Sequence, residues 1–251
     1  MRGGGPPRGF TEFTVRKARV VCAEPFADDF RAALRDSTLY DYARRDPNAR
    51  VFAGRGASYG IRFPSSAERV VVRHNRHGGL LAPFTGDVFR VPTRAPLELE
   101  VSERLRSLEI PTPRLLGFVT YAVMPGFERA DVATREVEDA TDLSASLTSN
   151  DRVVRERALH AAAALVRRLS DAGARHHDLN IKNVLLRGEG ERVAPTAFVL
   201  DVDRVTFGLD RSSAVEANVA RFVRSAKKWQ RLHGASVTDA ELESFASMVR
   251  G

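Results

Sequence analysis

The fold of this chain is decided by the stretch His176-His177-Asp178-Leu179-Asn180-Ile181-Lys182-Asn183 together with Phe198-Val199-Leu200-Asp201. The order is H-x-D-x-x-x-x-N, then a short apolar strand, then a strand that ends in aspartate. Phosphoryl transfer needs an acceptor hydroxyl held in line and a divalent metal that neutralises phosphate charge. The spacing predicts that Asp178 orients and deprotonates the acceptor hydroxyl, that Asn183 holds one metal ion, and that Asp201 bridges metal and phosphates.

Two further residues of this stretch have predicted roles. Lys182 lies between Asp178 and Asn183, where a cation would stabilise charge on the transferring phosphoryl group. For His176 we expect a structural role, because adjacent histidine side chains diverge and the sequence offers no third metal ligand nearby. We expect His176 to brace the catalytic loop against the strand that carries Asp201.

Length and composition bound the class of protein. The 251 residues suffice for two closely packed lobes, and 43% hydrophobic and 28% charged residues are ordinary for a globular protein. The longest apolar run, around residues 161–166, is far shorter than the roughly 20 residues of a membrane span. The Gly/Pro-rich start lacks the apolar core of a secretory signal, and a single cysteine excludes an internal disulfide. We therefore expect a cytoplasmic protein.

The charge balance predicts an anionic partner. The net charge is +7 and the isoelectric point is about 10.1, which suits a phosphorylated substrate or a membrane surface. No basic stretch is interleaved with aromatic residues, so no nucleic-acid partner is expected. Basic residues at helical spacing near the C-terminus form one stripe, which either rests on anionic lipid headgroups or is a solvated helix face. They are Arg221, Arg224, Lys228 and Arg231.

The order of predicted elements, strands first and helices second, is that of a bilobal protein-kinase-like α+β fold with a β-rich N-lobe holding one helix and a mainly helical C-lobe. We expect an N-terminal extension at residues 1–45 with a disordered start, a nucleotide-binding N-lobe at 46–137, and a catalytic and acceptor-binding C-lobe at 138–251. Strands are predicted near residues 14–21, 51–60, 69–73, 121–124 and 130–134. Helices are predicted near 28–34, with Asp28 or Asp29 as cap, and near 95–108, 151–171, 213–233 and 238–249.

The predicted N-lobe contains a glycine-rich turn. Gly54 and Gly56 lie where such a loop covers the phosphates of ATP, and glycine lets backbone N–H groups approach phosphate without a clashing side chain. Two glycines in a turn also suit an ordinary hairpin. The position upstream of the catalytic loop favours the nucleotide-binding interpretation.

An arginine stands where protein kinases keep the lysine that holds the α- and β-phosphates. Arg73 ends a β-branched strand, and a guanidinium can bind phosphate with two hydrogen bonds. Arg76 and His77 are alternative cations. We expect Glu98 to pair with Arg73 from the following helix, with two competing carboxylates on the same helix, Glu100 and Glu103.

Three blocks of sequence resemble the lipopolysaccharide kinase family, most closely the 3-deoxy-D-manno-octulosonic acid (Kdo) kinases. The blocks are Val70–Leu81 with its Gly78-Gly79, Arg94–Glu98 running on to Ile110–Pro113, and His177–Leu186 with Leu200–Arg204; Asn218–Ser225 is also similar. The Arg-rich strand followed by Gly-Gly separates this group from protein kinases and aminoglycoside-type kinases. Asn75 and Val202 depart from the aromatic residues of the family pattern.

The resemblance implies an enzyme that transfers the γ-phosphate of ATP, with Mg²⁺, to a Kdo hydroxyl on lipid A precursor. Such an acceptor is anionic and lies in the cytoplasmic leaflet, so the resemblance also implies peripheral contact with the cytoplasmic face of the inner membrane. A kinase for a core heptose, or for another small molecule or a protein, remains an alternative on the same fold. A pseudokinase or basic binding module is the alternative from another class, and the intact Asp178, Asn183 and Asp201 argue against it.

Overall fold

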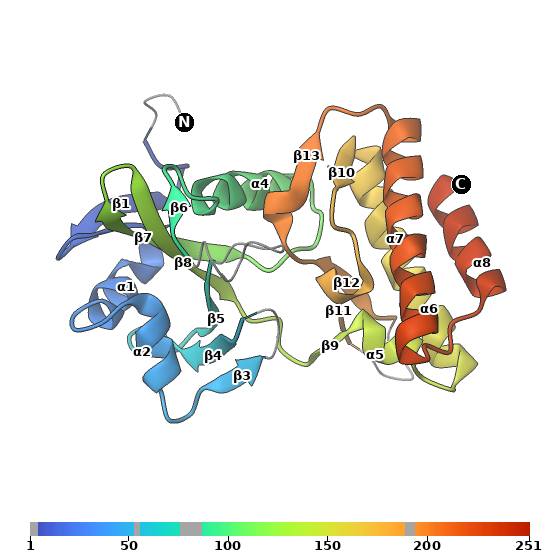
Figure 1. The fold of residues 1–251 in the computed structure, drawn as a ribbon, viewed down its shortest axis with the longest axis horizontal. Helices are drawn as coiled ribbons and strands as arrows, with labels where there is room; N and C mark the ends of the chain where they lie inside the picture. The colour runs from blue at the N-terminus through green and yellow to red at the C-terminus, as the bar shows by residue number, and fades with distance from the viewer. Residues whose placement is uncertain (1–4, 53–55, 76–86, 189–193) are drawn as a thin grey trace. The chain divides into compact units, whose positions relative to one another are not determined.

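The computed structural model describes residues 5–52, 56–75, 87–188 and 194–251 (Figure 1). The chain forms two compact units. Unit 1 comprises Met1–Glu103 and Arg114–Glu136, and unit 2 comprises Arg104–Pro113 and Val137–Gly251. Strands dominate unit 1 and helices dominate unit 2, as the predicted α+β fold requires.

Unit 1 is built on one antiparallel sheet in the order β1-β2-β7-β8-β5-β4-β3, with β6 paired to β8. The long hairpin of β7 and β8 lies in the middle of this order, and Phe118, Val119 and Val132 from it are almost completely buried. The strands are β1 (Phe10–Val15), β2 (Ala18–Ala23), β3 (Arg50–Phe52), β4 (Ser58–Arg62), β5 (Arg69–His74), β6 (Phe89–Arg90), β7 (Leu115–Met124) and β8 (Phe127–Arg135).

Residues 10–45, expected as an extension outside the N-lobe, belong to unit 1. The single strand expected near 14–21 is wrong: β1 and β2 form a hairpin, because the chain reverses at Arg16, which has a left-handed φ of 57°. The 3₁₀ turn η1 (Glu24–Phe26) and the helices α1 (Ala27–Ala33) and α2 (Leu39–Arg45) follow. The helices expected near 28–34 and 95–108 are therefore present as α1 and α4 (Ala95–Ser107), and α2 is a helix that was not predicted.

Asp28 and Asp29, expected to cap a helix, lie inside the first turn of α1. The side chain of Asp29 is buried and instead accepts hydrogen bonds from the backbone N–H groups of Ser65 and Ser66 at 2.7 and 3.2 Å. Because a buried carboxylate requires partners, it is held by the loop between β4 and β5 and is not available as a cap.

A buried charge network joins β5 to β8 within unit 1. His74 Nδ1 lies 2.5 Å from Asp131 Oδ1, and Nε2 lies 2.8 Å from Asp87 Oδ2. Asp131 is fully buried and also accepts hydrogen bonds from the Tyr121 hydroxyl at 2.9 Å and the Tyr40 backbone N–H at 3.0 Å. Burial lowers the pKa of His74, but the hydrogen bonds and charges of the two carboxylates outweigh it and the pKa is raised. The imidazolium form can donate to both carboxylates at once.

Unit 2 is built around three long helices that lie side by side in Figure 1: α6 (Arg152–Asp171), α7 (Arg211–His233) and α8 (Asp239–Arg250). The predicted helix boundaries hold to within two residues. Asp151 caps α6 by accepting from Val153 N at 2.8 Å, and Thr238 caps α8 in a capping box. The rings of Phe222 on α7 and Phe245 on α8 stack with their centroids 4.2 Å apart.

The remaining elements of unit 2 are short. They are β9 (Ala140–Asp142), α5 (Leu143–Leu147), β10 (Ala174–His176), the 3₁₀ turn η2 (Ile181–Asn183), β11 (Val184–Arg187), β12 (Thr196–Val199), the 3₁₀ turn η3 (Val202–Arg204) and β13 (Val205–Phe207). The strands form two small sheets, β10-β13 and β12-β11-β9.

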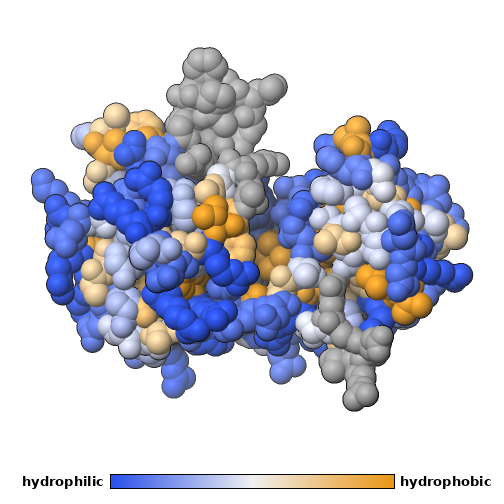
Figure 2. All heavy atoms as spheres, turned by 90° about the horizontal axis from the view of Figure 1, so that it is seen from below, coloured by the Kyte–Doolittle hydropathy of each residue, from blue (hydrophilic) through white to orange (hydrophobic). Residues whose placement is uncertain are grey.

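The face of the molecule shown in Figure 2 carries mostly hydrophilic residues. On this face, hydrophobic residues appear only in small areas. Within the described ranges, no helix combines the length and the apolar character needed to cross a bilayer.

Candidate active site

The catalytic loop of unit 2 runs from the end of β10 to η2. The Asn180 side chain begins η2 by accepting hydrogen bonds from the backbone N–H groups of Lys182 at 2.9 Å and Asn183 at 3.1 Å. Asn183 Nδ2 then donates to the backbone oxygen of Asp178 at 2.9 Å. This cap joins residues only two and three positions apart. It forms because an Asn side chain readily accepts hydrogen bonds from the free N–H groups at the start of a turn. It places Asp178 and Asn183 at the two ends of one hydrogen-bonded loop.

His176 ties this loop to the end of β12. Its Nε2 lies 2.9 Å from the backbone oxygen of Leu200, and its Nδ1 lies 3.1 Å from the backbone nitrogen of Asp178. Burial lowers the pKa of His176, so the ring is neutral, donates from Nε2 and accepts at Nδ1. The predicted bracing role of His176 is confirmed. Its contact on the far side is with Leu200, the residue that precedes Asp201.

The carboxylate of Asp178 is kept ionised by a residue of α7. The Arg221 guanidinium donates to Asp178 Oδ1, with both side chains about one-third exposed. Burial raises the pKa of Asp178, but hydrogen bonding by Asn180 and Arg221 and the charge of Arg221 outweigh it, and the pKa lies below its ordinary value. A base must be deprotonated at the working pH, so this environment suits proton acceptance at neutral pH.

We expect the variant Arg221→Met to lose activity at a higher pH than the parent protein as the solution is made acidic. The prediction that Asp178 is the base implies that activity needs the ionised carboxylate, so we expect activity to fall as the pH falls through the pKa of Asp178. Without Arg221 this pKa rises, so the loss begins at higher pH. The measurement is the pH profile of kcat/KM. Arg224→Met, an exposed position on the same helix, is the control; an unshifted acidic limb in Arg221→Met would contradict the assignment.

Asp201 follows β12 in an unusual backbone conformation. Its φ and ψ are 52° and 47°, in the left-handed region that only Gly, Asn and Asp visit at modest cost. The turn leads directly into η3 and leaves Asp201 exposed. The backbone N–H of Leu200 donates to the backbone oxygen of Asn183 at 2.9 Å, so Asn183 and Asp201 are adjacent across two chain segments.

The donor set of Asn183 and Asp201 fits Mg²⁺. The ion prefers oxygen ligands and commonly takes only one or two from protein, with phosphate and water completing its shell. The Asn183 amide is oriented by its Nδ2 bond to Asp178, which leaves Oδ1 as the oxygen donor. Within the described ranges, no group of three or more His, Cys, Asp or Glu side chains forms a protein-only metal cage. Bound there, the ion would neutralise phosphate charge.

Lys182 already has an anionic partner in unit 2. Its Nζ lies 2.8 Å from Asp142 Oδ2 and 5.3 Å from the centre of the Trp229 ring. Both charged side chains are roughly half exposed, and such a pair is worth little in water. A phosphoryl group can therefore compete with Asp142 for this ammonium.

The α7 helix supports the loop through two polar residues that sequence reasoning missed. Asn218 is fully buried, accepts from the backbone N–H of His176 at 3.0 Å, and donates to the Ala174 backbone oxygen at 2.9 Å. Ser225 Oγ accepts from the backbone N–H of Ile181 at 3.2 Å. A polar residue on the apolar face of a predicted helix was the available signal, since buried amides require partners.

Unit 1 carries the predicted phosphate-binding arginine. Arg73, near the end of β5, forms an ion pair with Glu98, which is 4% exposed on α4. Asn75 Oδ1 also accepts from Arg73 at 2.9 Å. Among the three candidate carboxylates, Glu98 is thus the one found in contact with Arg73. These two contacts hold the Arg73 guanidinium in one position. A fixed position favours phosphate binding by a planar group whose N–H donors must be aligned with the phosphate oxygens.

The glycine-rich turn is only partly visible. Gly54, Arg76 and His77 lie outside the described residues, and Gly56 lies in the connection between β3 and β4. Gly60, in β4, packs so closely that an added Cβ would lie 2.8 Å from the Phe52 ring. Gly60 therefore has a packing role.

Comparison with known proteins identifies relatives over most of the chain. A sequence model of the lipopolysaccharide kinase (Kdo/WaaP) family matches residues 48–248. The 3-deoxy-D-manno-octulosonic acid kinase of Actinobacillus succinogenes is 30% identical over 179 residues, 69% of this chain and 72% of the relative. That of Photobacterium damsela subsp. piscicida is 25% identical over 203 residues, 78% of this chain and 80% of the relative.

A solved structure, WaaP in complex with acyl carrier protein, has the same fold. It aligns with a TM-score of 0.59 and 17% identity over 92% of this chain and 88% of the other. The predicted protein-kinase-like fold is confirmed by this likeness. The matched region contains Arg73, Glu98 and the whole catalytic loop, and the chain belongs to the lipopolysaccharide kinase (Kdo/WaaP) family.

Proposed function

We propose that this protein transfers the γ-phosphoryl group of ATP to a hydroxyl of Kdo carried on lipid A precursor. Its family makes it an ATP-dependent kinase that acts on a sugar hydroxyl. Three relatives that it resembles over most of its length are named as 3-deoxy-D-manno-octulosonic acid kinases. The observation that carries the proposal is the catalytic loop, in which Asp178 is ionised, paired with Arg221 and tied to both Asn183 and the chain leading to Asp201.

Each site residue has a proposed part in this transfer. Asp178 accepts the proton of the acceptor hydroxyl as its oxygen attacks the γ-phosphorus, while the bond from that phosphorus to the β,γ-bridging oxygen breaks and ADP leaves. Asn183 and Asp201 hold Mg²⁺ against the phosphates, and Lys182 stabilises charge on the transferring group after exchanging Asp142 for phosphate. In unit 1, Arg73, oriented by Glu98, binds the α- and β-phosphates, with Gly54 and Gly56 in the loop over them.

A lipid-linked acceptor also implies work at a membrane surface. We place the protein in the cytoplasm, in peripheral contact with the cytoplasmic face of the inner membrane. The net charge of +7 favours association with anionic lipid, and an acceptor that carries carboxylate and phosphates suits a basic protein.

The test incubates purified protein with ATP, Mg²⁺ and detergent-dispersed Kdo-bearing lipid A precursor, and looks by mass spectrometry for one added phosphate. We expect phosphorylation of this lipid and loss of turnover when Mg²⁺ is chelated. Transfer only to a heptose-bearing core acceptor would replace Kdo by heptose in the proposal. Transfer to neither would remove the glycolipid acceptor altogether.

A further inference from the structure

The turn between β7 and β8 carries an unusual run of apolar residues. All six residues from Ala122 to Phe127 are exposed and none is charged. The exposed fractions of the large side chains are 40% for Val123, 56% for Met124 and 40% for Phe127. Large apolar side chains grouped on a surface indicate an interaction site more often than isolated ones do.

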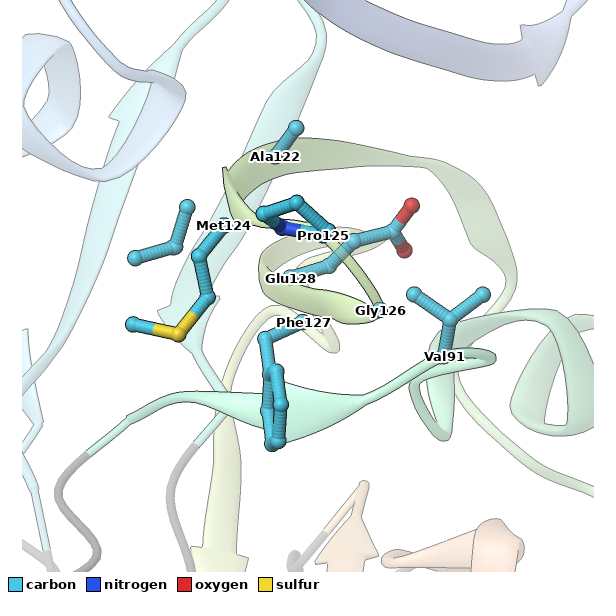
Figure 3. Close-up of a pocket in the computed structure, with 8 residues that line it drawn as sticks. Val91, Ala122, Met124, Pro125, Gly126, Phe127 and Glu128 are labelled. Atoms are coloured by element: carbon cyan, nitrogen blue, oxygen red, sulfur yellow. The ribbon is translucent and has the colours of Figure 1, made fainter.

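A neighbouring segment extends this apolar tip. β6 pairs with β8, and the backbone N–H of Val91 donates to the Gly126 oxygen at 3.0 Å, which brings Val91, 48% exposed, to the turn. Figure 3 shows Met124 and Phe127 next to one another, with Val91 beyond Gly126. Together they border a hollow of about 370 Å³. We call Val91, Val123, Met124 and Phe127 the apolar tip.

The turn itself does not require these side chains. Pro125 followed by Gly126, with φ of +79°, is the usual pair for a type II turn. Met124 and Phe127 stand on either side of this pair, where polar residues are equally compatible with the backbone. In the described part of unit 1, the neighbouring Tyr121 is partly buried and packs against the hydrophobic core, whereas no residue of the apolar tip belongs to that core or packs against it.

Basic residues lie at the same end of the sheet as the apolar tip. Ala18 pairs with Tyr121 in register, so Arg16 and Lys17, both exposed, lie level with the start of the tip on the adjacent hairpin. Arg90 is exposed and pairs in register with Phe127. Around this end of the sheet five basic residues face three acidic ones: Arg16, Lys17, Arg19, Arg90 and Arg129 against Glu12, Asp87 and Glu128.

We propose that the apolar tip inserts into the interfacial layer of an anionic bilayer, with Arg16 and Lys17 at the level of the lipid headgroups. Apolar side chains bordered by cations are the combination that binds such an interface. This inference rests on the peripheral membrane contact proposed above and assigns it to a surface of unit 1. The basic stripe on α7 is a weaker candidate for the membrane contact. Arg221 pairs with Asp178, so the other members of the stripe are Arg224, Lys228 and Arg231.

The test is co-sedimentation of the full chain with vesicles of phosphatidylethanolamine and phosphatidylglycerol, and with vesicles of phosphatidylcholine alone. The parent protein should bind the anionic vesicles in a salt-sensitive way. The double variant Met124→Asp/Phe127→Asp should lower the partition coefficient by at least about tenfold, since two large side chains can no longer be buried. Arg16→Glu/Lys17→Glu should remove the preference for anionic lipid.

Two controls separate docking from folding and from catalysis. Val51→Asp changes a valine that is 65% exposed elsewhere in unit 1 and should leave vesicle binding unchanged. Phosphorylation of detergent-dispersed acceptor should be equal in the parent and the tip variant, so failed docking and failed kinase activity are distinguishable.

Four results would overturn the proposal. The first is parental binding by the tip variant, and the second is no binding of the parent protein to anionic vesicles. The third is loss of binding in Lys228→Glu with retention in the tip variant, which would assign the contact to α7. The fourth is a parent protein that does not bind vesicles but forms a dimer, with the dimer lost in the tip variant. That result would make a second copy of the chain the partner of the apolar tip.

Discussion

The variant Asp178→Asn is expected to lose between about 10²-fold and 10⁴-fold in kcat while it binds Mg-ATP as the parent protein does. An amide keeps the shape of the carboxylate and can still be held by the loop, but it cannot accept the proton of the acceptor hydroxyl. Single-turnover phosphorylation of the lipid acceptor gives the rate. Calorimetric titration with a non-hydrolysable nucleotide analogue gives the affinity.

A suitable control is Asp171→Asn, at the end of α6. Asp171 forms an exposed ion pair with Arg211 at 2.7 Å, and its change to asparagine should leave kcat unaffected. Near-normal turnover in Asp178→Asn would show that another group accepts the proton. A parallel loss of nucleotide affinity would show that the substitution had disturbed the loop and not only the base.

The variant Asp131→Ala is expected to destabilise unit 1 by roughly 3–5 kcal/mol. The substitution removes the buried acceptor shared by His74, Tyr121 and the backbone of Tyr40, and it takes from the His74 ring one of its two carboxylate partners. Buried donors left without an acceptor are among the most costly results of a single substitution.

Cys22 offers a readout specific to unit 1. It is the only cysteine of the chain, it is fully buried in β2, and burial raises its pKa to about 12, so its thiol is unreactive while the unit is folded. Urea unfolding followed by pulse labelling of this thiol measures the stability of unit 1 alone. Asp36→Ala, at an exposed position, should change the free energy of unfolding by less than about 0.5 kcal/mol. A change below about 1 kcal/mol in Asp131→Ala would mean that the network is not a major source of stability.

The catalytic loop could be predicted from sequence because its geometry is local. The Asn180 cap, the Asn183–Asp178 bond and the His176 contacts to the loop join residues within five positions of one another. Arg73 was placed by its position on a β-branched strand. Its contact with Glu98 spans 25 residues, and sequence spacing alone left three carboxylates open.

The partners on α7 could not be found in the same way. Arg221 lies 43 residues from Asp178 and was grouped with a basic stripe, since helical spacing shows that residues share a face but not what that face meets. Asn218 is 42 residues from His176. The network of Asp87 and Asp131 around His74 was missed for the same reason, because strand order within the sheet is not encoded by local pattern.

The hairpin of β1 and β2 was missed for a different reason. The reversal between β1 and β2 occurs at Arg16-Lys17, with a left-handed arginine in place of the usual Gly or Asn. When a turn contains none of the residues typical of turns, such as Gly, Asn, Asp or Pro, the sequence of the two strands resembles that of one continuous strand. The hairpin was therefore not separated from the strand expected near 14–21.

Unit 2 includes residues 104–113, which are synthesised before the remaining part of the unit, residues 137–251. Val199 N donates to the Pro111 oxygen at 3.0 Å, and Thr112 Oγ1 donates to the Val199 oxygen at 3.0 Å, across 87 residues. On the ribosome, this early segment emerges first, and β7 and β8 of unit 1 emerge before β12 exists to receive it. The two units therefore mature in an interleaved order, and a fragment that begins at residue 137 lacks a piece of its own fold next to Asp201.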